Sequence, residues 1–123
     1  MIGVLEKLLH MSALFDFYGP LLTDKQRRCL QMHLFEDFSL SEISQELGIS
    51  RQAVYDMLRR SEQLMQQYED RLHLVARAQE QQVLLERLRA DLTDFKQSFA
   101  QKSAKENEDT LNDIMGLVSM LIK

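Results

Sequence analysis

The sequence is poor in the residues that interrupt helices and in those that cross-link chains. Its 123 residues include one Pro, four Gly, one Cys and no Trp. A single Cys excludes an internal disulfide, and together with the lack of a secretory leader it predicts a reducing, cytoplasmic location. So few Pro and Gly residues favour helix over strand. We therefore predict an all-α protein.

Long apolar runs and an excess of basic residues are also missing. The apolar segment 1–20 is interrupted by Glu6, Lys7, His10 and Asp16, so it fits neither a signal sequence nor a membrane-spanning helix. We predict no membrane partner. The chain has 15 Lys and Arg against 19 Asp and Glu, a net charge of −4. Such a chain gains little from phosphate neutralisation, which dominates non-specific nucleic-acid binding.

Patterns that indicate catalysis or metal binding are missing too. The three His are far apart in the sequence, and no pair of Cys or His has the spacing of metal ligands. There is no Gly-rich phosphate loop and no nucleophile elbow. Cys29 follows Arg27 and Arg28, which favour a thiolate, but no His or Asp partner accompanies it. We predict a non-enzymatic protein without cofactor or metal.

Helix start and stop signals divide the first 75 residues. Residues 4–18 carry apolar side chains at mostly helical spacing, and Gly19-Pro20 ends that helix. Residues 23–26 and 39–42 have the pattern of capping boxes, each of which predicts the start of a helix. Gly48 follows the second of these helices, at a position where positive φ is favoured.

Ser50 then caps a long helix, so the segment "SLSEISQELGISRQAVYDMLRR" predicts a helix-turn-helix. Its apolar positions can face inward together and fix the angle between the two helices, while the polar start of the second helix faces outward. In this motif the outward positions meet base edges and phosphates in a major groove. The candidate nucleic-acid-binding residues are Ser50, Arg51, Gln52, Tyr55, Arg59 and Arg60. The same tri-helical core also serves as a protein-docking module.

The stretch from "LTDKQRRCLQMHLFEDF" to "SEQLM", residues 22–65, resembles region 4 of bacterial sigma factors, a promoter-reading module. "ALFDFYGPLLTDKQ", "SRQAVYDMLRRSE" and "YEDRLHL" narrow the resemblance to the YlxM family of small helix-turn-helix proteins, over about residues 10–75. The resemblance implies a sigma-region-4-like tri-helical core with an N-terminal helix. The family's genes commonly lie beside those of the signal recognition particle, which implies a regulatory or adaptor role with a protein or RNA component of that pathway.

The charges of the second helix depart from those of a promoter reader. Residues 50–62 carry three Arg against Asp56 and Glu62, a balance of +1. This supplies little affinity for a phosphate backbone. Two functions therefore remain open: an adaptor of the signal recognition particle pathway, and a dimeric DNA-binding transcription regulator.

The last third of the chain carries apolar seams. Polar residues 76–82 predict either continued helix or a hinge. Apolar residues then recur at three- and four-residue spacing from Leu85 to Phe99, and after a polar break at 100–109 we expect Thr110 to cap a last helix. We predict a helix-turn-helix domain over 1–75 and a C-terminal helical hairpin over 76–123. Surplus apolar surface on the N-terminal helix, the hairpin or both predicts a homodimer.

Overall fold

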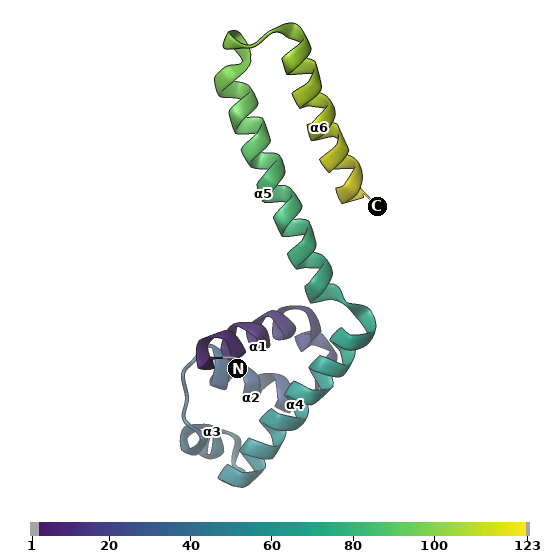
Figure 1. Cartoon of the computed structure of the whole chain (residues 1–123). Coiled ribbons are helices and arrows are strands. Elements are labelled where there is room, and N and C mark those ends of the chain that lie inside the picture. Colours follow the sequence, from purple (N-terminus) through teal and green to yellow (C-terminus); the bar gives the residue numbers. More distant parts are fainter. Residues whose placement is uncertain (1–2, 123) are drawn as a thin grey trace. The chain divides into compact units, whose positions relative to one another are not determined.

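The computed structural model describes residues 3–122, and the chain is all-helical within that range (Figure 1). The α-helices are α1 (Val4–Tyr18), α2 (Asp24–Leu34), α3 (Leu40–Leu47), α4 (Arg51–Leu72), α5 (Leu74–Ser98) and α6 (Ala104–Ile122). The predicted fold class is confirmed. The chain divides after Val75 into two compact units, the first built on α1 to α4 and the second on α5 and α6. Over residues 3–122, no helix is long and apolar enough to cross a membrane.

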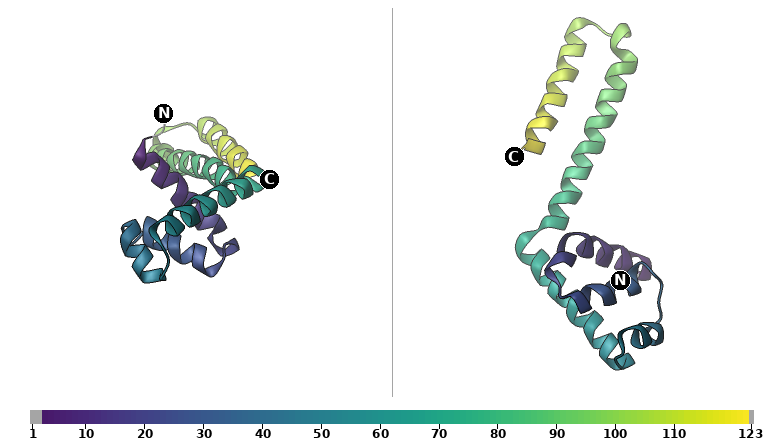
Figure 2. Two further views of the ribbon diagram at one scale, coloured as in Figure 1. Left: turned by 90° about the horizontal axis from the view of Figure 1, so that it is seen from below. Right: turned by 180° about the vertical axis from the view of Figure 1, so that it is seen from behind.

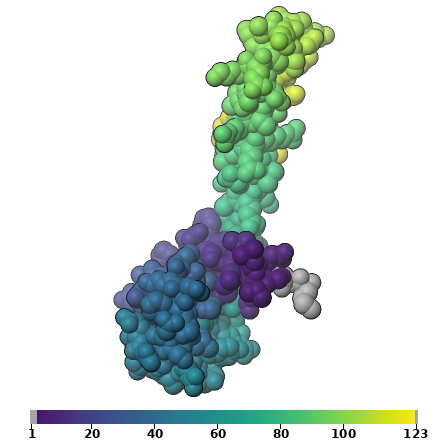
Figure 3. All heavy atoms as spheres, turned by 90° about the vertical axis from the view of Figure 1, so that its left-hand side faces the viewer, coloured from purple at the N-terminus to yellow at the C-terminus, as the bar shows by residue number. Residues whose placement is uncertain are grey.

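Helix α4 is the centre of the first unit, because α1, α2 and α3 all pack against it (Figure 2). On the face seen in Figure 3 the atoms of these helices form one continuous body. All four helices contribute to the core. Its fully buried side chains are Leu14, Tyr18, Cys29, Leu30, Met32, Ile43, Val54 and Met65. Helix α1 therefore completes the tri-helical core rather than lying beside it.

The signals for helix starts and stops in the first unit are confirmed. The Thr23 hydroxyl accepts the Gln26 N–H at 3.2 Å, and the Gln26 side chain accepts the Thr23 N–H at 3.0 Å. Ser39 and Glu42 make the same reciprocal pair, with both distances 3.1 Å. Gly48 has a φ of 67°, as expected of a helix C-terminus that turns sharply.

Only the second half of α1 is buried. Met11, Leu14 and Tyr18 face the core, whereas Val4 and Leu5 are exposed. The apolar spacing over 4–18 predicted the helix but not the extent of its buried face, because this helix has more apolar side chains than the core covers.

Of the two alternatives predicted for residues 76–82, continued helix is confirmed, because these residues are helical within α5. The break in the helix lies earlier, at His73, whose φ is 56°. The expected cap at Thr110 is wrong, because α6 begins at Ala104. The Ser103 hydroxyl accepts the Glu106 N–H at 3.2 Å, and Thr110 lies inside the helix, where its hydroxyl donates to the Glu106 carbonyl at 3.1 Å.

A buried carboxylate fixes the first turn of α5. Glu69 of α4 is only 9% exposed. Its Oε1 accepts the Tyr18 hydroxyl at 2.5 Å and the Val75 N–H at 2.9 Å, while the Leu74 N–H donates to the Tyr18 oxygen at 3.2 Å. These side chains satisfy N–H groups that have no acceptor within their own helix. Burial and the hydrogen bond with Glu69 raise the pKa of Tyr18, so its hydroxyl remains a donor.

The second unit is an antiparallel hairpin of α5 and α6 (Figure 1). A short 3-10 turn, Phe99–Gln101, follows α5. The Asn107 side-chain amide donates to the Phe99 carbonyl at 3.1 Å and so closes the connection between the helices. Ile114 and Leu117 are the buried apolar residues of α6.

We predict that Tyr18→Phe destabilises the first unit by about 1–3 kcal/mol, because it leaves the Leu74 N–H without its acceptor and Glu69 without one of its donors. Urea unfolding followed by circular dichroism measures the change. Tyr68→Phe is the matched control: the Tyr68 ring lies 5.9 Å from that of Tyr18, but its hydroxyl makes no hydrogen bond among residues 3–122. Equal effects of the two variants would contradict the assignment.

Candidate nucleic-acid interface

The helix-turn-helix is formed by α3, the turn at Gly48 and the start of α4. Helix α3 packs directly on α4. The Ser44 hydroxyl donates to the Ile49 carbonyl at 2.6 Å and closes the turn. The Ser50 hydroxyl accepts the Ala53 N–H at 3.0 Å and begins α4. Two local hydrogen bonds therefore set the direction of α4, together with the buried side chains of Ile43 and Val54.

All six candidate residues are exposed and lie between the N-cap of α4 and the middle of the helix. Ser50 is the N-cap. The other five recur about every four residues along the helix, at positions 51 and 52, 55, and 59 and 60. Val54, Leu58 and Ser61 face the core instead. Asp56 shares the exposed side with them. We call this surface the outward stripe of α4; it consists of Arg51, Gln52, Tyr55, Asp56, Arg59 and Arg60.

Two side chains of the outward stripe bind each other. The Gln52 amide donates to Asp56 Oδ1 at 3.1 Å. Reading an adenine with Gln52 requires both the oxygen and the NH₂ group of the amide. The bond to Asp56 uses one of the two N–H donors and holds the amide along the helix, so this pair opposes base recognition.

The three arginines of the stripe are available to an anionic partner. Arg51, Arg59 and Arg60 make no ion pair with any residue in the range 3–122. Glu62, which lowered the charge balance of this segment in the sequence, is half-buried and lies 4.0 Å from the Lys7 ammonium group. That contact joins residues far apart in the chain and has no local sequence signal. The stripe itself then carries three positive charges and one negative charge.

The surroundings of the stripe are acidic. Glu42 and Glu46 are exposed on α3, and Glu46 lies two residues before Gly48. Residues 1–75 contain eleven Asp and Glu against eight Lys and Arg, a net charge of −3. The arginines can hold phosphates or carboxylates through charge-assisted hydrogen bonds, but the unit as a whole does not attract a duplex from a distance.

Cys29 is not an activated thiol. It is fully buried in α2, and this burial raises the pKa of Cys29 to about 11. The expected stabilisation of a thiolate by Arg27 and Arg28 is therefore wrong, because these side chains turn elsewhere. Arg27 donates to the Gly19 and Leu22 carbonyls, and Arg28 pairs with Glu36 at 3.1 Å. Within residues 3–122, no group of three or more His, Cys, Asp or Glu could hold a metal ion.

Comparison with known proteins places the chain in a family. The model of a family described as "Putative helix-turn-helix protein, YlxM / p13 like" matches residues 5–107. The chain belongs to this family. The match confirms the resemblance found over about residues 10–75 and extends it through α5 into α6.

Relatives cover most of the chain. A UPF0122 protein of Halalkalibacterium halodurans is 40% identical over 96% of both chains. Another from Oceanobacillus iheyensis is 45% identical over 74% of this chain and 87% of its own. A third, from Listeria innocua, is 38% identical over 89% of this chain and 97% of its own. The YlxM-like family thus includes both units of the chain.

We predict that Cys29 of the folded protein resists alkylation by iodoacetamide at pH 8 and reacts in urea. Because its pKa is raised to about 11, the neutral thiol prevails at every pH below that value, and burial excludes the reagent. Mass spectrometry of the labelled chain measures the extent of reaction. Labelling of the native protein at the rate of the unfolded one would contradict this account.

Proposed function

We propose that this YlxM-like protein is a non-enzymatic adaptor of the signal recognition particle pathway, which docks a protein or RNA component through the outward stripe of α4. The observation that carries the proposal is the composition of the stripe: the bonded Gln52–Asp56 pair is flanked by three arginines that make no ion pair with any described residue. Such a mixture of charges and hydrogen-bonding groups complements a surface with donors, acceptors and both signs of charge. It complements a uniform duplex backbone less well.

The pathway is inferred from the family resemblance, because genes of the YlxM family commonly lie beside those of the signal recognition particle. The scaffold contributes rigidity. Both ends of the turn are fixed by hydrogen bonds, at Ser44 and at Ser50. A partner therefore meets a preformed surface, and little conformational entropy is lost from the backbone on binding.

A dimeric DNA-binding regulator is the second candidate. The observation that favours it is the placement of Ser50 and Arg51 at the N-terminus of α4, where a recognition helix contacts bases, with Arg59 and Arg60 further along at positions suited to phosphates. In that case Asp56 faces the DNA and weakens its binding.

We expect Arg59→Ala and Arg60→Ala each to weaken binding of the full chain to the RNA or the protein of the signal recognition particle about tenfold or more, because each removes a charge-assisted contact. Arg71→Ala is the matched control, since Arg71 is an exposed arginine of α4 outside the stripe. Fluorescence titration at two salt concentrations measures the affinities. Failure of the wild type to bind either component would reject the adaptor.

The same titration on a random duplex and on the promoter of the protein's own operon tests the regulator. The adaptor predicts weak binding to both, with dissociation constants of roughly tens of micromolar or more near physiological salt. A regulator instead prefers the promoter. Asp56→Asn then strengthens binding, and Arg51→Ala relaxes the sequence preference at a cost of about 1–3 kcal/mol.

A further inference from the structure

The hairpin of the second unit buries one seam of each helix and leaves the neighbouring positions uncovered. The seam of α5 consists of the half-buried residues Leu84, Leu88, Asp91, Phe95 and Ser98, at alternating spacings of four and three. The seam of α6 consists of the buried or half-buried residues Asn107, Thr110, Ile114, Leu117 and Leu121, at alternating spacings of three and four. These two rows are the lines along which the helices pack.

Each seam residue is followed by a residue that is more exposed. A step of one residue turns a helix by about 100°. Because α5 and α6 run in opposite directions, the same step turns both rows toward the same side of the hairpin. We call this side the hairpin face. It consists of Leu85, Arg89, Leu92 and Lys96 from α5, Phe99 from the 3-10 turn that follows α5, and Glu108, Leu111, Met115, Val118 and Ile122 from α6.

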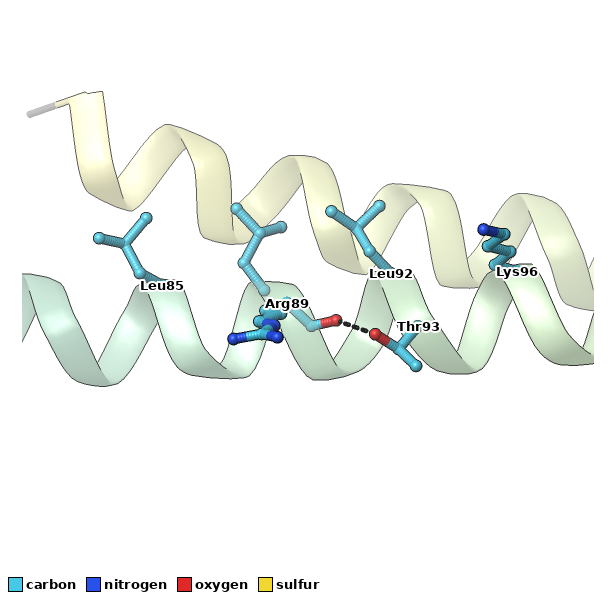
Figure 4. Close-up of a pocket in the computed structure, with 6 residues that line it drawn as sticks. Leu85, Arg89, Leu92, Thr93 and Lys96 are labelled. Atoms are coloured by element: carbon cyan, nitrogen blue, oxygen red, sulfur yellow. Dashed lines mark hydrogen bonds between the residues drawn. The ribbon is translucent and has the colours of Figure 1, made fainter.

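The hairpin face is largely apolar. Seven of its ten residues are apolar, and six of these are exposed; only Val118 is half-buried. Two adjoining open hollows of about 390 and 520 Å³ lie along α5. In Figure 4, Leu85 and Leu92 extend to the side of α5 on which α6 lies, and Arg89 and Thr93 extend away from it. The hollows can take side chains from a helix that packs across them.

The charges of the hairpin face are divided between its two helices. Helix α5 contributes only cations, Arg89 and Lys96, and α6 contributes only an anion, Glu108. No ion pair involves these three residues within the part of the chain that the structure describes. Asn107 bonds to Phe99, so Lys96 and Glu108 both lie within about one turn of the closed end of the hairpin.

We propose that a second copy of this chain covers the hairpin face and forms a four-helix bundle. A twofold axis along the hairpin packs α5 of each copy over α6 of the other. The cations of α5 in one copy then lie over the anion of α6 in the other, and Lys96 faces the partner's Glu108. This self-complementarity identifies the occupant, because a twofold interface brings the same surface of both subunits together. The inference is independent of the proposed function.

The test compares two methionines of α6 in the full chain. Met115 is 60% exposed and lies on the hairpin face, whereas Met120 is 55% exposed and precedes the seam residue Leu121, so it lies on the opposite side. Sedimentation velocity across micromolar concentrations should give twice the monomer mass of 14.4 kDa for the wild type. We expect Met115→Glu to weaken dimerisation at least about tenfold and Met120→Glu to leave it unchanged.

Charge exchange tests the orientation. Lys96→Glu should weaken the dimer, and the double variant Lys96→Glu with Glu108→Lys should restore it, because the exchanged charges again face each other. Circular dichroism confirms that each variant keeps its helices. A monomeric wild type, equal effects at Met115 and Met120, or no rescue in the double variant would overturn the proposal. Dissociation by Leu5→Glu in α1, with Met115→Glu unaffected, would overturn it in favour of an interface on α1.

Discussion

The buried carboxylate of Glu69, on α4, connects α1 with the first two residues of α5, which belong to the first unit. A charge with so little exposure is tolerated only when hydrogen bonds replace the water it has lost, and Tyr18 and Val75 supply such bonds. Tyr18 also ends the buried half of α1, so the residue that satisfies the carboxylate anchors this helix to α4. The same oxygen holds the first turn of α5. Three helix ends therefore depend on one side chain.

Local physics made most of the fold predictable. Capping boxes act over three residues and the Gly48 turn over one, so Thr23, Ser39 and Gly48 could be identified from the sequence alone. The hydrogen bond between Tyr18 and Glu69 joins residues 51 positions apart, and no local sequence pattern predicts it. Thr110 was misjudged because a Thr inside a helix bonds to its own backbone as readily as a Thr at a cap. In the sequence, Ser103 and Thr110 are equally suited to cap α6, and only the folded hairpin shows that Ser103 is the cap.

The outward stripe of α4 was predictable for the same reason, since helical periodicity alone places its residues on one side. The four-residue spacing of Gln52 and Asp56 also permits their hydrogen bond. The pairing of Glu62 with Lys7 brings α1 to α4 and needed the tertiary structure. The hairpin face was only half predictable. Periodicity predicted one apolar seam from Leu85 to Phe99, but the packing of α5 on α6 covers only Leu88 and Phe95 of that row and leaves Leu85, Leu92 and Phe99 exposed.

The offset of one residue between seam and hairpin face constrains how this part of the chain can evolve. A residue inserted within α5 or α6 rotates everything beyond it by about 100°. The apolar row then divides between two sides of the hairpin. Length changes in the connection at residues 100–103 carry no such penalty, because both helices keep their phase. Selection on the tail therefore acts on residue count within each helix more strictly than on residue identity, as many apolar side chains can fill the same row.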